Sequence, residues 1–222
     1  MEIKKTKYLI FIVFLLFFLD LLAYYFVVKK GSSLLSFIYS NLDSLNNSKV
    51  SIKGIAFTNS AKILDGTIAF YLENNNYLID VRGFDNIEKG EIVEIEGKVI
   101  TSPIVMVWGE KIKKLGKREG YSIQEKCENV KNLRSFKENE VKEGELFTTI
   151  FTLSNYTVKT IFPEKSKEEF VYRFKWYETD LNSFYVSSEN ITFSLNKKYK
   201  VCAILLPSYK SKIIRIFSIW FL

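Results

Sequence analysis

Residues 89–99 read Lys-Gly-Glu-Ile-Val-Glu-Ile-Glu-Gly-Lys-Val, and this stretch decides the fold. The Lys-Gly pair at its start is typical of a turn. Apolar or small residues then take every second position, at Val93, Ile95, Gly97 and Val99. Strand side chains point alternately to two faces, so this period predicts a strand over residues 92–100 with one buried face. Gly97 has no Cβ and predicts a bend or bulge in that strand.

The same two-residue period continues on both sides of this stretch. Asp65-Gly66 and Asn74-Asn75-Asn76 indicate turns between the earlier strands, and Pro103 ends the long strand. The other predicted strands span residues 50–54, 68–72, 77–82 and 104–112. Five short strands of this kind predict a small closed barrel over residues 48–116.

Three stretches of this barrel resemble the oligonucleotide/oligosaccharide-binding (OB) fold family. They are Val50-Ser-Ile-Lys-Gly54, Gly66-Thr-Ile-Ala-Phe-Tyr-Leu72 and the 89–99 stretch, and the resemblance covers roughly residues 48–115. It implies a ligand face on the second and third strands and the adjacent loops. It is nearly silent about the ligand, because one fold hosts many functions.

A polar, charge-rich connector over residues 117–144 precedes a second β domain over residues 145–222. The order of its predicted strands resembles a second, degenerate OB barrel, through the stretches 184–188, 197–204 and 212–216. This copy lacks the glycine that marks the first, and an immunoglobulin-like β-sandwich fits the pattern too. The sequence therefore predicts a mostly β protein and leaves the second domain open between these two architectures.

An apolar run of 21 residues, Tyr8 to Val28, lies near the N-terminus. As a helix it would span about 30 Å, which is the thickness of a hydrocarbon core. It predicts a retained single-pass anchor within residues 1–30, followed by a juxtamembrane linker or short helix over 31–47. A cleaved signal peptide is the alternative, but it would have a shorter apolar run and a small-residue cleavage site. Three lysines before the run and two after it favour an extracytoplasmic location for the C-terminal domains.

The chain contains no His, which removes the commonest general base and metal ligand. The sequence also lacks a Gly-rich phosphate loop and a metal-ligand cluster, so we expect a non-enzymatic protein without metal or cofactor. One N-terminal helix and an external OB barrel also resemble the haem chaperone of cytochrome c maturation. That family attaches haem through a His, so only the architecture carries over and we expect no haem.

The chain has two cysteines, Cys127 and Cys202. They could form a disulfide if the domains lie outside the cytoplasm, or they could be two unrelated thiols.

The formal charge of +7 is unevenly distributed along the chain. Residues 48–116 carry nine basic and nine acidic residues, whereas residues 117–222 carry eighteen and thirteen. A neutral first barrel does not promise the concentrated basic face of a general nucleic-acid binder. Our leading hypothesis is therefore a membrane-tethered binding or assembly module with protein partners at the cell envelope.

The alternative hypothesis is a tethered binder of single-stranded nucleic acid, which needs aromatic platforms beside cations. Candidate ligand-binding side chains lie opposite the core phase of the strands, or near the rim of the barrel in the case of Trp108. They are Lys53, Tyr71, Arg82 and Trp108 in the first barrel and Arg173, Lys175 and Tyr177 in the second domain. These residues could equally be ordinary outer-strand residues that only pair across strands.

Overall fold

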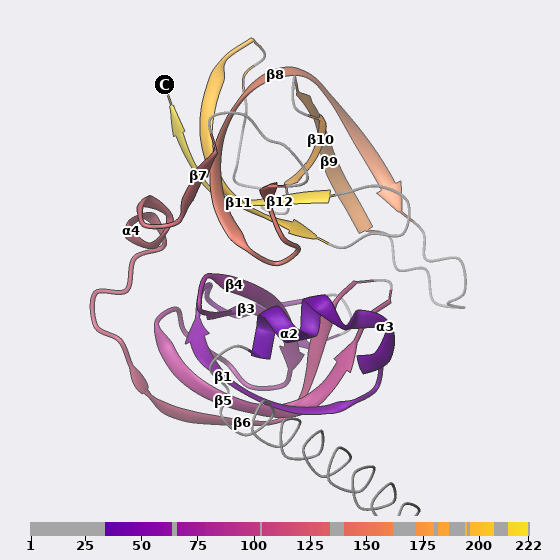
Figure 1. Ribbon diagram of the computed structural model, residues 1–222, viewed down its shortest axis with the longest axis vertical. Helices are drawn as coiled ribbons and strands as arrows, with labels where there is room; N and C mark the ends of the chain where they lie inside the picture. The colour runs from indigo at the N-terminus through magenta and orange to yellow at the C-terminus, as the bar shows by residue number, and fades with distance from the viewer. Residues whose placement is uncertain are drawn as a thin grey trace, which may run out of the picture.

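The computed structural model describes residues 34–63, 66–102, 104–133, 140–161, 172–179, 182–186, 194, 196–206 and 213–221. The predicted membrane anchor in residues 1–30 lies outside this part of the chain. Within it, no helix combines the length and the apolar character that a membrane span requires. In Figure 1 the second domain is drawn above the first barrel.

The first sheet closes into the predicted five-stranded barrel. The five strands of the barrel are β1 (Lys49–Ala56), β3 (Ile68–Asn74), β4 (Tyr77–Gly83), β5 (Glu91–Ile100) and β6 (Met106–Lys117), and the two-residue strand β2 (Ala61–Lys62) pairs with β3 outside the ring. They lie in the order β1-β5-β6-β4-β3-β2, and a further pairing of β1 with β3 closes the ring. The β4–β6 pair is parallel, whereas the other pairs are antiparallel.

Strand β6 continues to Lys117, further than the predicted end at residue 112. Its second half is mostly exposed and shows no apolar period, so hydrophobic patterning could not detect it. The register places Lys111 opposite Glu96 and Lys113 opposite Glu94 on β5. Opposite charges facing each other across two strands stabilise such an exposed ladder.

The predicted irregularity at Gly97 is confirmed. The register between β5 and β6 shifts between Glu96 and Gly97. A Cβ at position 97 would overlap the backbone carbonyl of Trp108 on β6. The missing side chain therefore lets the two strands approach at the bulge, which fixes the position of Trp108.

Two short helices before the barrel belong to its core. These are α2 (Leu34–Ser40) and α3 (Leu42–Leu45), and Leu35, Ile38 and Leu45 are buried in one cluster with the barrel interior. The Tyr39 hydroxyl also donates a hydrogen bond to the Leu78 carbonyl on β4, at 2.7 Å. The segment predicted as a juxtamembrane linker or short helix thus forms two short helices that pack on the first barrel. Its helical spacing was visible in the sequence, but the surface that it packs on was not.

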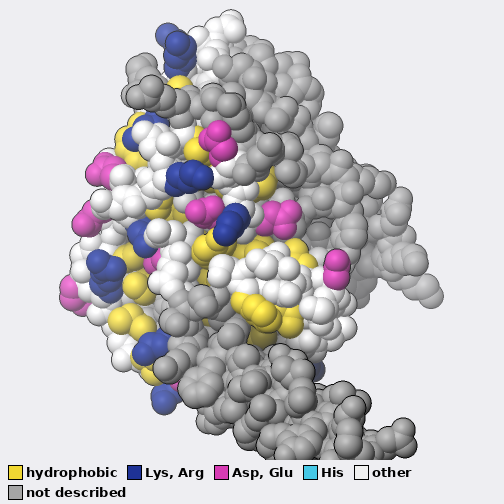
Figure 2. Space-filling model, viewed as in Figure 1, with side chains coloured by type: hydrophobic (Ala, Val, Ile, Leu, Met, Phe, Trp, Pro, Cys, Tyr) yellow, Lys and Arg dark blue, Asp and Glu magenta, His cyan; other side chains and the backbone are white. Residues whose placement is uncertain are grey.

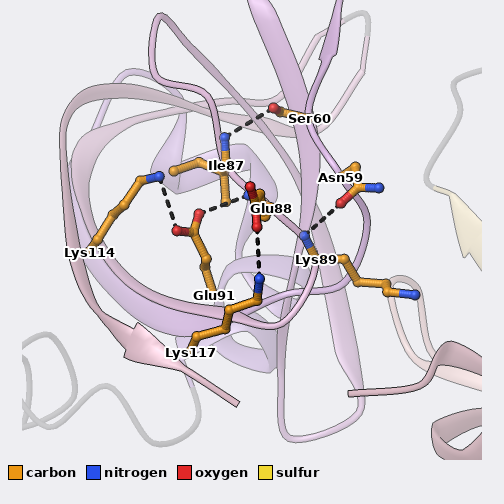
Figure 3. A network of polar contacts seen from close by, with 8 residues as sticks. All are labelled: Asn59, Ser60, Ile87, Glu88, Lys89, Glu91, Lys114 and Lys117. Carbon is orange, nitrogen blue, oxygen red and sulfur yellow. Dashed lines mark hydrogen bonds and ion pairs between the residues drawn. The ribbon is translucent and has the colours of Figure 1, made fainter. Parts of the chain in front are cut away.

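The loop between β4 and β5 covers the end of the barrel where β1 finishes. Ile87 is buried in the barrel core, and its N–H donates to the Ser60 hydroxyl at 3.0 Å. The Lys89 N–H donates to the Asn59 side chain at 2.8 Å, and Lys114 pairs with Glu91 at 3.0 Å (Figure 3). The first two contacts tie the loop to the segment between β1 and β2, and the ion pair joins the start of β5 to β6.

The second sheet contains β7 (Lys131–Leu133), β8 (Leu146–Ile161), β9 (Tyr172–Thr179), β10 (Asn182–Val186), β11 (Lys198–Leu206) and β12 (Ile213–Phe221). Their order is β11-β12-β10-β9-β8-β7, and β11 also pairs with β8. The five long strands therefore pair in the same order as those of the first barrel, and β10 and β12 run parallel as β4 and β6 do. This order favours the degenerate barrel over the β-sandwich.

We expect Gly97→Ala to lower the free energy of unfolding by about 2–3 kcal/mol, because the new methyl group must displace the β6 backbone. Gly83→Ala on β4 is the matched control, since a Cβ there would make only ordinary van der Waals contacts. Urea unfolding followed by circular dichroism measures both variants. Equal midpoints for the two variants would contradict this account of the bulge.

Candidate functional site

The two domains meet in an apolar cluster that we call the seam. The first barrel contributes Phe57, Tyr71 and Leu78, and the rest of the chain contributes Cys127, Leu146, Cys202 and Ile204, all buried. Phe217 on β12 packs edge-on against both Phe57 and Tyr71, with ring centroids 5.2 and 4.9 Å apart. Burial of these apolar and aromatic side chains stabilises the contact between the domains.

Backbone hydrogen bonds continue the seam where the chain enters the second domain. The Leu78 N–H donates to the Gly144 carbonyl at 2.9 Å, and the Leu146 N–H donates to the Asn76 carbonyl at 2.7 Å. Gly144 has a φ of 73°, and a Cβ there would overlap the ring of Tyr39 on α2. Glycine is therefore required at this position both for its conformation and for the approach of α2.

A disulfide joins the connector to the second domain. Cys127 on α4 (Ile123–Glu128) is bonded to Cys202 on β11, across a sequence separation of 75 residues. Of the two readings that the sequence left open, the structure shows the disulfide. Lys126 beside it pairs with Glu73 on β3 at 3.1 Å, so α4 contacts both domains.

Tyr71 lies on the outer side of its strand, as the core phase predicts, but it is only 4% exposed. The guanidinium carbon of Arg215 on β12 lies 4.2 Å from the centroid of its ring. Arg215 also donates a hydrogen bond to the Tyr71 hydroxyl. Tyr71 is therefore a seam residue, and in this structure it is not accessible as a stacking platform. Sequence reasoning missed Arg215 because this contact joins residues 144 positions apart.

Next to the seam, the outer face of the first barrel carries a row of aromatic and basic side chains. The register places Arg82 on β4 beside Trp108 on β6, and Trp108 beside Lys98 on β5. Phe84 packs edge-on against Trp108 at 6.0 Å between centroids and is 73% exposed. We call Arg82, Phe84, Lys98 and Trp108 the Trp108 face. It brings together two of the predicted ligand residues, and Phe84 and Lys98 are added by the structure.

The basic side chain of Lys98 on the Trp108 face forms an exposed ion pair and has a second lysine beside it. Lys98 pairs with Glu110 at 3.1 Å, but both side chains are more than 40% exposed, so the ion pair contributes little to stability. Lys49 lies opposite Lys98 in the register of β1 and β5, which adds a further exposed lysine. On the side of the molecule shown in Figure 2, basic and acidic side chains are interspersed.

Asp80 is buried where the Trp108 face meets the seam. Its carboxylate oxygen Oδ2 lies 3.6 Å from Nε of Arg82. Burial raises the pKa of Asp80, while the charges of Arg82 and Arg215 act in the opposite direction. This carboxylate is therefore close to guanidinium groups from both domains.

The other predicted residues lie away from the Trp108 face or beyond what is described. Lys53 is exposed on β1 opposite Glu94 and is not brought to the face. Arg173, Lys175 and Tyr177 lie on β9, whose strand is described but whose side chains are not. A ligand role for these three residues stays a prediction.

No protein-family model matches the chain, and no curated protein matches it. Three similar solved structures show how distant its structural neighbours are. The p204 HINb domain shares 10% identity over 81% of this chain and 100% of that domain, with a TM-score of 0.33. A murine DNA binding protein bound with ds DNA shares 7% identity over 78% of this chain and 96% of that protein's chain, with a TM-score of 0.36. One chain of a Replication Protein A heterotrimer bound to ssDNA shares 11% identity over 79% of this chain and 49% of that chain, with a TM-score of 0.30.

The first barrel is an OB fold. The strand pairings of the first barrel define this fold. The strands β1, β3, β4, β5 and β6 are the first to fifth strands of the barrel. They close the ring in the order first, second, third, fifth and fourth, and the parallel pair is formed by the third and fifth, which are β4 and β6. In OB folds the second and third strands and nearby loops form the ligand face. These strands are β3 and β4 here, so the Trp108 face begins on β4 and continues onto β6 and β5.

We expect Gly144→Ala to destabilise the protein more than Gly120→Ala does. Both glycines have positive φ values, so each alanine incurs about 1–2 kcal/mol of backbone strain. Only the alanine at 144 also meets the ring of Tyr39, whereas position 120 has open space around it. Thermal unfolding of the two full-length variants tests this, and equal melting temperatures would contradict the close approach at Gly144.

Replacing both cysteines by serine should lower the free energy of unfolding by about 2–4 kcal/mol, because the bond closes a long loop of chain. The measurement is chemical unfolding of the double variant beside the oxidised wild-type protein. Wild-type protein treated with a reductant is the control and should unfold like the variant. An unchanged midpoint in both cases would show that the bond is absent or without effect on stability.

Proposed function

We propose that this protein binds single-stranded nucleic acid along the Trp108 face of its OB barrel. The observation that carries the proposal is the row Arg82, Trp108 and Lys98 on three adjacent strands, with Phe84 exposed beside it. An aromatic ring can stack on any base, and flanking cations can contact the phosphates on either side of it. Such a face would bind with little sequence preference and with strong dependence on salt.

The distribution of exposed apolar groups favours this ligand over a protein partner. Many protein-binding surfaces, above all those of obligate complexes, present a contiguous apolar patch. Among the described residues, the large exposed hydrophobic side chains are Phe84, Leu115 and Ile150, which lie on the β4–β5 loop, on β6 and on β8. Single apolar groups on separate elements do not form such a patch. The first barrel has a net charge of zero, but its basic side chains include a local row on the Trp108 face. The net charge is therefore compatible with nucleic-acid binding.

We infer that the second β domain is a second OB barrel, because its strands pair in the order of the first. It carries its own aromatic and basic pair, with Nζ of Lys200 5.4 Å from the ring centroid of Trp220. Two barrels in one chain would lengthen the path available to an extended strand.

In this proposal the protein is a non-enzymatic binding module that remains tethered by the N-terminal apolar run. The disulfide between Cys127 and Cys202 supports an oxidising compartment for the folded domains, which agrees with the extracytoplasmic location expected from the lysine bias. The function would then be to hold nucleic-acid strands at the outer surface of a membrane.

The test is binding of fluorescent oligothymidylate of about 20–30 nucleotides to the full-length protein in mild detergent, followed by anisotropy at several salt concentrations. We expect Trp108→Ala to weaken binding about 10–100-fold, because it removes one stacking platform. The same titration should show a steep loss of affinity between about 50 and 200 mM salt.

Two lysines of the same barrel provide a matched pair of controls. Lys98→Ala should reduce the slope of log affinity against log salt by about one, because one phosphate contact is lost. Lys53→Ala removes an equally basic side chain away from the face and should leave the slope unchanged. Absence of binding at low salt, or identical behaviour of Trp108→Ala and the wild type, would reject the proposed function.

A further inference from the structure

Where the Trp108 face meets the seam, one carboxylate lies near two guanidinium groups. Asp80 and Arg82 come from β4 of the first barrel, and Arg215 comes from β12 of the second domain. The charges of both arginines act on Asp80. One carboxylate compensates the charge of one arginine, so this group carries a surplus positive charge.

The hydrogen bonding of the two arginines is also incomplete. The Nε atoms of Arg82 and Arg215 are both buried and have no hydrogen-bond partner in the described part of the chain. The 3.6 Å between Arg82 and Asp80 is an ion-pair distance but is too long for a hydrogen bond. Arg215 uses another of its nitrogens for the Tyr71 hydroxyl and lies over the rings of Tyr71 and Phe217. Buried donors without an acceptor are unfavourable, and an ordered water or a bound anion would satisfy them.

The other acids described near this point have interactions of their own. Glu73 pairs with Lys126 at 3.1 Å. Glu143, whose charge acts on Tyr39 together with that of Asp80, is engaged in a further interaction. Among the carboxylates of the described residues, Asp80 is the one on which the charges of both arginines act, so within this part of the chain a surplus positive charge remains.

We infer that Arg82 and Arg215 together bind one anionic group of the ligand, so that the site extends from the first barrel onto the second domain. This inference rests on the proposed function, under which the group is a phosphate of the nucleic-acid backbone. Guanidinium groups suit phosphate because their donors are arranged in a planar fork. Arg82 is the cross-strand neighbour of Trp108, so the phosphate would lie next to a base stacked on that ring.

The test uses the full-length protein and the oligothymidylate titration. Arg215→Gln should weaken binding about tenfold and reduce the salt slope by about one. Arg215→Lys keeps the charge and should keep the slope while losing part of the affinity. Lys126→Gln is the matched control, because it also removes a seam cation, but one whose charge is already compensated by Glu73. Its slope and affinity should equal those of the wild type.

A second measurement uses inorganic phosphate as the probe, compared with chloride at equal ionic strength. Phosphate should raise the melting temperature of the wild-type protein and of Lys126→Gln, but not that of Arg215→Gln. This arm does not depend on nucleic acid, so it separates a site for phosphate in general from a site that serves the proposed ligand.

The outcomes distinguish the inference from the proposed function. An unchanged salt slope in Arg215→Gln, together with weaker binding by Trp108→Ala, would overturn the shared anion site and leave the proposed function standing. Phosphate stabilisation that requires Arg215, without any oligothymidylate binding, would support the shared anion site and reject the proposed function. If Arg215→Gln does not fold, Arg82→Gln carries the same expectations, and an unchanged slope and phosphate response in that variant would overturn the inference.

Discussion

The packing of Arg215 and Phe217 on the ring of Tyr71 is the contact on which the arrangement of the molecule depends. It brings the second domain over part of the outer face of β3 and β4, which is the side where an OB barrel binds its ligands. Tyr71 and Leu78 become interior residues, while Arg82, Trp108 and Phe84 stay at the edge of the covered area. The domain contact thus decides which part of the outer face of β3 and β4 remains exposed.

The connector shows how the chain keeps this contact in one register. α4 is joined to β11 by the disulfide and to β3 by the ion pair of Lys126 with Glu73. Gly144 then lets the backbone pass against α2 and donate and accept hydrogen bonds at the entrance of the second domain. Figure 1 shows this path, in which the connector runs beside the first barrel and meets the second domain at α4. Fixation at these separate points restricts the domains to one relative position.

Much of the first barrel could be predicted because its strands bury one face and follow a strict two-residue period. The same period placed Tyr71 on the outer side of β3, and the absence of a Cβ at Gly97 indicated the bulge. Burial of Tyr71 could not be predicted, since local sequence contains no information about a partner that lies 144 positions away. The neighbourhood of Arg82 and Trp108 was also hidden, because it arises from the parallel pairing of β4 with β6 rather than from adjacent strands of a hairpin. The second domain was ambiguous for a similar reason, as strand order depends on long-range pairing.

The burial of α2 has a mechanical consequence for a membrane-bound protein. Leu35 is already part of the barrel core, and the apolar run expected to cross the bilayer ends at Val28. Even a fully extended chain spans at most about 3.5 Å per residue, so this junction would let the barrel rise only about 20–25 Å from the end of the span. A tether that short sets a small capture radius, and any long polymer engaged by the barrel would have to be drawn close to the lipid headgroups.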